Sequence, residues 1–227
     1  LRPHTKLTLI MTLALILGGF FLTLMTEWNN PNTFAGQDLS NRLLQAFFQS
    51  VTMRTAGFAT MDYTQAEPVT LLIWSGLMFI GGSPGGAAGG LKTTTVAVIL
   101  LFIRQTVTNK QYIHFDKHNI PSRTIRMALV VGALYTSLFL TSTLILQWLE
   151  PQTELILLVF EAVSAMATVG VSASLTPTLS VASLIYIMFL MFVGRIGPLT
   201  LVTALPFESA GSREADIKYA DTNILIG

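Results

Sequence analysis

Long apolar runs alternate along the chain with shorter apolar runs that end in small residues. Three runs, 7–26, 125–149 and 178–205, have the roughly 20 mostly apolar residues that a membrane-spanning helix needs. Two further runs, 41–53 and 153–167, are too short to span. Irregular backbone at membrane depth is tolerated only where protein or a water-filled cavity surrounds it. We therefore predict spanning helices for the long runs and re-entrant helices for the two short ones.

The apolar stretch 68–104 is too long for a single span. Its roughly 37 residues would form a helix of ~55 Å, against a hydrocarbon core of ~30 Å. The sequence GGSPGGAAGGLKTTT interrupts it at 81–95, where Pro84 would help to stop the preceding helix. We predict a broken span whose halves are separated by a glycine-rich intramembrane loop at 81–95.

Composition supports a membrane protein and excludes several classes of site. The chain is 52% hydrophobic and only 11% charged, with a mean hydropathy of +0.62, whereas soluble domains carry about 25% charged residues. A net charge of +1 gives no basic surface for nucleic acid, and the absence of cysteine excludes disulfides and thiolate metal sites. His114 and His118 are four residues apart, which fits either a zinc-binding helix face or a solvated loop beside Lys110 and Lys117.

Charge placement predicts how the chain is oriented in the membrane. The segment 104–126 holds five basic residues and a single acidic one, Asp116, whereas 27–40 and 149–154 are poor in lysine and arginine. By the positive-inside rule, the middle segment and both termini are expected on the cytoplasmic side. Both short helices would then enter the membrane from the outside.

Two motifs recur along the chain at one offset. Residues 77–81, LMFIG, match 190–194, LMFVG, and residues 55–58, TAGF, match 168–171, TVGV, both at an offset of 113 residues. Two separated motifs that share one ungapped offset indicate an internal repeat.

Each repeat has the order span, short helix, loop, span, so both enter the membrane in the same sense. We predict an all-α membrane protein with two tandem, parallel pore-loop repeats at 1–104 and 124–206. A cytoplasmic linker at 105–123 would join them, and a cytoplasmic C-terminal tail would occupy 207–227.

The loop after each short helix suits a dehydrated cation. The carboxyl end of a helix carries partial negative charge, and TVGV resembles the start of the TVGYG potassium-channel filter, where carbonyl oxygens replace the hydration shell. Arg54 is expected to face protein and brace the first loop, and Glu161 either pairs with such a charge or lies behind the filter. The predicted ion-binding residues are Thr55, Ala56, Gly57, Phe58, Thr168, Val169, Gly170 and Val171.

The stretches SVTMRTAGF, LMFIGGSPGGAAGGLKTTT, ATVG and LMFVGRIGPLTL resemble the pore-forming membrane subunit of bacterial Ktr potassium uptake systems. These belong to the larger family that includes Trk and the plant high-affinity potassium transporters. The resemblance implies four repeats in one chain, of which these two resemble the third and fourth. It therefore implies a preceding half with two further repeats.

The same resemblance implies function and partners. Potassium would be the substrate at the filter carbonyls, without a covalent cofactor, and sodium is a coupling ion in some members. The protein would be a multi-pass homodimer in the bacterial cell membrane, on a cytoplasmic ring of nucleotide-binding regulatory subunits. The intramembrane loop would act as a gate with an arginine of the last span, and the residues implied are Gly82, Ser83, Gly85, Gly86, Gly89, Gly90, Lys92 and Arg195.

Parts of the sequence also fit three other interpretations. A nucleotide-binding enzyme is disfavoured because Leu91 stands between Gly90 and Lys92, one residue out of register with a phosphate-binding loop. A sodium-coupled secondary cation transporter with a midplane site remains the alternative, since broken spans occur there too. A purely structural membrane subunit is disfavoured by the paired filter-like glycines.

Overall fold

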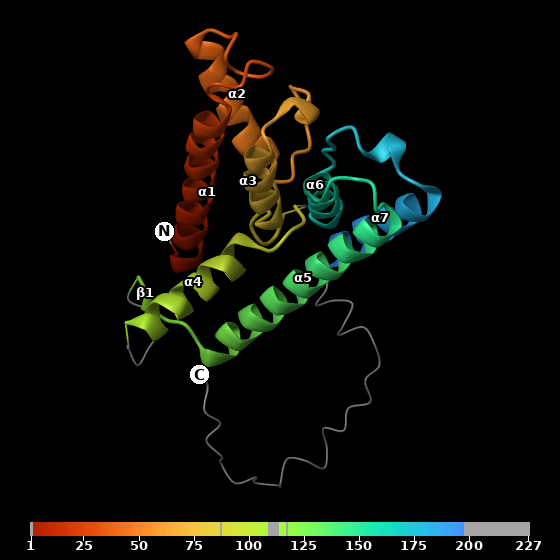
Figure 1. Ribbon diagram of the computed structural model, residues 1–227. Helices are drawn as coiled ribbons and strands as arrows, with labels where there is room; N and C mark the ends of the chain where they lie inside the picture. The colour runs from red at the N-terminus through yellow and green to blue at the C-terminus, as the bar shows by residue number, and fades with distance from the viewer. Residues whose placement is uncertain (1, 87, 109–113, 117, 198–227) are drawn as a thin grey trace.

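The computed structural model describes residues 2–86, 88–108, 114–116 and 118–197, and this part of the chain is almost entirely helical (Figure 1). Short 3-10 turns at Tyr63–Gln65 and Thr176–Thr178 precede the third and last helices. The helices are α1 (Pro3–Glu27), α2 (Leu39–Thr52), α3 (Pro68–Phe79), α4 (Thr93–Val107), α5 (Ser122–Leu149), α6 (Leu155–Met166) and α7 (Val181–Ile196).

Helices α1 and α5 are the two elements of the described part that are long and apolar enough to cross a membrane. They have 25 and 28 residues and contain the predicted spans 7–26 and 125–149. Helix α7 occupies the start of the third predicted span, and the remainder of that span beyond residue 197 lies outside the described residues.

The predicted short helices are present as α2 and α6, with 14 and 12 residues. The predicted break in the apolar stretch 68–104 is also present, because α3 ends at Phe79 and α4 begins only at Thr93. The helix resumes three residues earlier than predicted, so Thr93–Thr95 belong to α4 and not to the loop. The amide of Thr93 donates to the carbonyl of Gly82 at 3.2 Å, which satisfies one of the free donors at this helix start.

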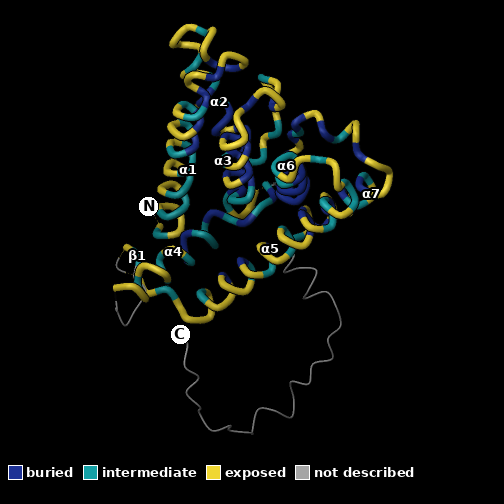
Figure 2. The backbone as a smooth tube through the Cα atoms, viewed as in Figure 1, coloured by how far each residue is buried: buried dark blue, intermediate teal, exposed yellow. Residues whose placement is uncertain are grey.

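Burial is highest in the middle of the molecule and lowest on the long helices (Figure 2). Every residue of α6 from 160 to 166 is buried, although this helix is too short to span a membrane. By contrast, large apolar side chains project outward from α1 and α5: Met25 is 76% exposed, Leu144 70% and Trp148 80%. Such apolar surface requires a lipid or protein cover.

A buried carboxylate joins the end of α1 to the start of α3. Glu27 is fully buried, and its carboxylate accepts hydrogen bonds from Asn30 Nδ2 at 2.7 Å, Thr33 Oγ1 at 2.6 Å and the Glu67 amide at 2.9 Å. These three donors compensate for the loss of hydration that burial of the carboxylate entails. The link joins two segments that are 40 residues apart in the sequence, with α2 between them.

The segment between α4 and α5 contains a small hairpin that the all-α prediction did not include. Strands β1 (His114–Phe115) and β2 (His118–Asn119) pair antiparallel, with Phe115 opposite His118. The two histidines therefore lie on different strands, and the helical zinc-site interpretation is wrong. The chain reverses at Asp116, which has a φ of +49°, and no group of three or more metal-ligating side chains occurs among the described residues.

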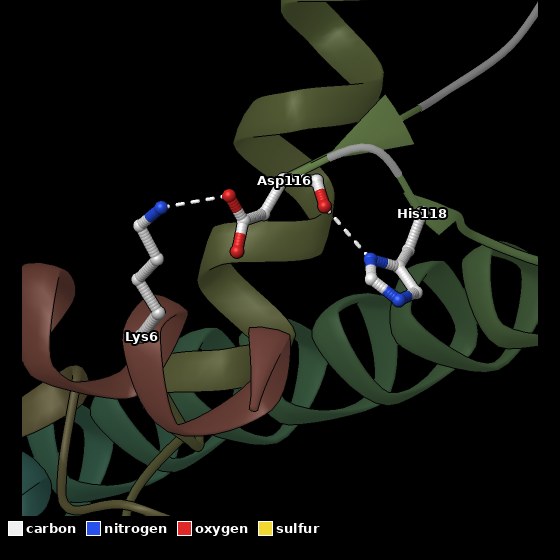
Figure 3. Close-up of polar contacts among 3 residues, drawn as sticks. All are labelled: Lys6, Asp116 and His118. Atoms are coloured by element: carbon white, nitrogen blue, oxygen red, sulfur yellow. Dashed lines mark hydrogen bonds and ion pairs between the residues drawn. The ribbon is translucent and has the colours of Figure 1, made fainter. Parts of the chain in front are cut away.

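The hairpin is attached to the start of α1. Asp116 Oδ1 accepts a hydrogen bond from Lys6 Nζ at 2.7 Å, and the Asp116 carbonyl lies 2.7 Å from Nδ1 of His118 (Figure 3). The N-terminal segment and the basic middle segment thus lie at the same end of the molecule, as the charge distribution predicts.

This ion pair makes a pH-dependent prediction. The hydrogen bond from Lys6 is the largest cause that lowers the pKa of Asp116 below its ordinary value. The pair should therefore favour the attached hairpin above the ordinary aspartate pKa, and its contribution should be lost as the pH falls through the lowered pKa. We expect Lys6→Gln to raise the Asp116 pKa toward its ordinary value in an NMR titration. Arg123→Gln, at an exposed position, is the control that should leave it unchanged.

Candidate functional site

The loops that follow α2 and α6 share an unusual backbone conformation. Thr55 and Gly57 have φ values of +70° and +80°, and Thr168 and Gly170 have values of +54° and +90°, whereas the residue between each pair has a negative φ. We refer to 55–58 and 168–171 as the first and second filter loops.

Threonine in the left-handed region is uncommon, because a β-branched side chain crowds the backbone there. Such strain persists only where the surrounding structure imposes it, and it concentrates at functional sites. Thr55 and Thr168 show it at equivalent positions of the two loops.

A hydroxyl from the last turn of each short helix braces the outer end of its loop. Thr52 Oγ1 donates to the Phe58 carbonyl at 2.7 Å, and Ser164 Oγ donates to the Val171 carbonyl at 2.5 Å. The sequence comparison missed this pair, because the ungapped offset of 113 aligns Thr52 with Ala165. Within the described residues, the carbonyls at 55–57 and 168–170 accept no hydrogen bond.

Polar side chains of the short helices also form hydrogen bonds with the segment that follows each filter loop in the sequence. Glu161 Oε2 accepts a hydrogen bond from Ser172 Oγ at 2.7 Å, and its other oxygen accepts one from Thr176. Of the two places considered for Glu161, the structure therefore shows the one behind its own loop. Gln49 has the corresponding role in the first group, where its side-chain oxygen accepts from the Tyr63 hydroxyl at 3.0 Å.

The two filter loops lie against each other. A methyl group on Gly57 would lie 2.0 Å from the carbonyl oxygen of Val169, so the backbone of the second loop touches the first. Gly170, in contrast, has open space at the corresponding position. The fourth residues also differ, since Phe58 is 70% exposed and Val171 only 4%.

The two ends of the intramembrane loop, residues 79–83 and 89–93, contact each other and form what we call its neck. The amide of Leu91 donates to the Phe79 carbonyl at 2.9 Å, and the Thr93 amide donates to Gly82 at 3.2 Å. The hydroxyls of Ser83 and Thr93 lie 3.1 Å apart. These contacts join the end of α3 to the start of α4, so the chain leaves and re-enters the helical region at one place.

Glycines perform two different tasks in this loop. A methyl group on Gly81 would lie 2.0 Å from the carbonyl oxygen of Gly89, and one on Gly90 would lie 2.7 Å from the Gly81 Cα, so the neck needs glycine for close approach. At the exposed tip, 84–86, Gly85 has a φ of +88° and open space around it, and Gly86 meets nothing closer than 3.8 Å. The neck is thus closely packed, whereas the tip is free of such contacts.

The neck lies directly against the second filter loop. A methyl group on Gly89 would lie 2.3 Å from the Ala167 carbonyl oxygen and 2.4 Å from Thr168 Oγ1. That hydroxyl is buried and has no hydrogen-bond partner among the described residues. Lys92 Nζ donates to the Ala88 carbonyl and so folds back over the same loop.

Arg195 lies between the filter and the intramembrane loop. It lines a cavity of about 470 Å³ together with Thr168 and Gly170, and a second cavity of about 300 Å³ together with Gly89 and Lys92. The structure therefore brings together most of the predicted gate and filter residues, with two basic side chains beside the loop.

Two short helices that end at facing loops, with long apolar helices beside them, are typical of helical membrane transport proteins. The chain belongs to the TrkH family, described as cation transport proteins, whose sequence profile matches residues 4–212. The predicted kinship with Ktr and Trk proteins is therefore confirmed.

Three similar proteins show the range of the resemblance. The chain is 38% identical to the potassium/sodium uptake protein NtpJ of Enterococcus hirae, over 99% of this chain and 50% of that protein. It is 35% identical to the Ktr system potassium uptake protein B of Vibrio alginolyticus, over 100% and 49%. The potassium transporter TrkH of Vibrio parahaemolyticus shares the fold, with a TM-score of 0.68 and 19% identity over 89% of this chain and 44% of that one. The chain thus spans about half the length of these relatives.

Proposed function

We propose that this chain supplies two of the four pore loops of a potassium-conducting path across the bacterial cell membrane. The observation that carries the proposal is the shared conformation of the two filter loops, with left-handed residues at Thr55, Gly57, Thr168 and Gly170. The choice of ion is supported by the relatives, which are named as a potassium/sodium uptake protein and a Ktr system potassium uptake protein.

In this proposal, a potassium ion sheds its water and is coordinated by the carbonyl oxygens of 55–57 and 168–170. The carboxyl ends of α2 and α6 point at the loops and add a partial negative charge that favours a cation. Phe58 and Val171 form the outer end of each loop, where the Thr52 and Ser164 hydroxyls hold their carbonyls. Two further loops, in the repeats that the family resemblance implies, complete the coordination shell.

The intramembrane loop and Arg195 form the gate. Neck residues Gly82, Ser83, Gly89 and Gly90 hold the loop under the second filter loop, and the tip, with Gly85 and Gly86, closes the path. The positive charges of Lys92 and Arg195, which line one cavity, raise the barrier to a cation while the loop is in place. The assembly we propose is a homodimer with cytoplasmic C-termini on a nucleotide-binding regulatory ring.

A sodium-coupled carrier with a midplane site is the second candidate. One observation favours it: a relative 38% identical to this chain is named a potassium/sodium uptake protein. Potassium flux that persists without sodium, at rates far above carrier turnover, would remove this candidate.

The proposed gate is tested by Arg195→Ala in the complete transporter that contains this chain, in cells with no other potassium uptake. Loss of the charge should raise maximal potassium uptake about tenfold, which corresponds to about 1.4 kcal/mol off the barrier. Arg123→Ala, at an exposed position on α5, is the matched control. Arg195→Ala uptake equal to that of the wild type would contradict the gate.

A further inference from the structure

Arg54 joins the first filter loop to the intramembrane loop. It follows the end of α2, one residue before Thr55, and its Nη2 donates to the carbonyl of Gly81 at 3.2 Å. Its Nε is buried and has no hydrogen-bond partner among the described residues. The side chain faces protein, as the sequence predicts, but its acceptor belongs to the neck of the intramembrane loop and not to the filter loop that it precedes.

The equivalent position in the second repeat touches the same neck. At the offset of 113 residues Arg54 corresponds to Ala167, whose carbonyl oxygen lies against Gly89. Gly81 and Gly89 in turn lie in contact with each other. The neck is therefore held between the two filter loops, by a hydrogen bond on one side and by close backbone packing on the other.

The contacts of the neck with the two filter loops differ in charge. Arg54 lies just beyond the carboxyl end of α2, and Gly81 lies just beyond the carboxyl end of α3. A cation is stabilised at such helix ends, so the guanidinium is held electrostatically as well as by its hydrogen bond. Ala167, at the equivalent position after α6, carries no charge; near that end the basic side chain is Arg195 of α7, which lines a cavity with Thr168 and Gly170.

We propose that Arg54 is a positioning residue that couples the first filter loop to the gate; the proposal rests on the proposed function. Arg54 directly precedes Thr55, the first residue of the filter loop. A shift of this loop therefore moves the guanidinium and, through its hydrogen bond, the Gly81 carbonyl. The neck moves together with the filter, and opening of the gate is confined to the tip at 84–86. Ion occupancy of the filter is thereby transmitted to the loop.

This coupling makes Arg54 differ from the tip in a measurable way. A change at Arg54 alters both the filter and the loop, so it should change the KM for potassium as well as the maximal rate. A change confined to the tip should alter the maximal rate alone, because 84–86 are exposed and lie at the far end of the closed neck.

The test measures potassium uptake by the complete transporter with Arg54→Gln and Arg54→Lys. We expect Arg54→Gln to raise KM about tenfold, the size expected for loss of one hydrogen bond from a charged group. Arg54→Lys keeps the charge and should recover part of that loss. Arg42→Gln is the matched control, since the Arg42 guanidinium also binds backbone carbonyls, at 2.8 Å from Gln37 and 2.6 Å from Ala35, but far from the gate along the chain.

Deletion of 84–86 separates the coupling from the gate itself. The deletion should raise the maximal rate with KM unchanged, and in the Arg54→Gln background its effect should be smaller than in the wild type. A normal KM for Arg54→Gln, in protein that reaches the membrane in wild-type amount, overturns the coupling, as does a full-sized deletion effect in that background. If the Arg54→Gln protein fails to accumulate, Arg54→Lys is used in its place. A wild-type KM for Arg54→Lys, together with a full-sized effect of the 84–86 deletion in the Arg54→Lys background, then overturns the coupling. A deletion without effect on uptake rejects the tip as gate, whereas the KM of Arg54→Gln still tests the link to the filter.

Discussion

We expect Gly57→Ala to abolish potassium uptake by the complete transporter that contains this chain. A methyl group at this position would lie 2.0 Å from the Val169 carbonyl oxygen, well inside van der Waals contact, and the residue has a φ of +80° that an L-residue with a side chain rarely adopts. Both filter loops would have to separate to admit it. Because the proposed ion coordination depends on carbonyl positions in both loops, we expect flux to fall below detection.

Gly170→Ala should have a smaller effect of a different kind. This glycine also has a left-handed conformation, with a φ of +90°, but it meets no atom within 4 Å. Only the backbone strain remains, about 1–2 kcal/mol. We expect about tenfold lower uptake and stronger competition by sodium, since a strained loop holds its carbonyls less accurately.

The measurement is uptake of potassium at several concentrations, with and without sodium, at matched amounts of protein in the membrane. Gly76→Ala is the control, because that glycine lies in α3 with open space around it and should tolerate the methyl group. Wild-type uptake and selectivity in Gly57→Ala would argue against ion coordination by these loops.

Gly89→Ala is expected to open the path. The methyl group would lie 2.3 Å from the Ala167 carbonyl oxygen and 2.4 Å from Thr168 Oγ1, so the neck could no longer rest against the second filter loop. A loop displaced from that position obstructs the path less. We expect maximal potassium flux to rise about tenfold, equivalent to about 1.4 kcal/mol in the barrier.

Gly18→Ala is the control for Gly89→Ala. It adds the same methyl group to a glycine of α1, where nothing lies within 4 Å of the added carbon. Flux through Gly18→Ala should equal that of the wild type. Equal fluxes in both variants would mean that the glycines of the neck do not position a gate.

The positions of the helices could be predicted from the sequence because hydropathy acts locally. The long runs at 7–26 and 125–149 lie inside α1 and α5, and the short runs coincide with α2 and α6 within a few residues. The need for a break in 68–104 followed from its length, since a straight helix of that size exceeds the membrane, and the glycine-rich sequence located the break at 81–95.

Contacts between distant residues could not be predicted in this way. The hydroxyl braces from Thr52 and Ser164 differ by one residue from the repeat offset, so an ungapped comparison does not pair them. The hairpin between α4 and α5 consists of strands of only two residues, too short to leave a periodic pattern. Nothing in the chain near Arg54 indicates Gly81 as its acceptor, 27 residues away.

The sequence by itself determined the membrane class, the helix order, the paired TAGF and TVGV loops and the family to which the chain belongs, because each depends on residue type and spacing. How the glycines divide between a packed neck and an open tip, and the contact of Arg54 with the intramembrane loop at Gly81, are evident only in the tertiary structure. A glycine has the same identity in both settings, and the difference lies in which atoms approach its Cα. That approach depends on how α3, α6 and the loops pack together, which no local pattern encodes.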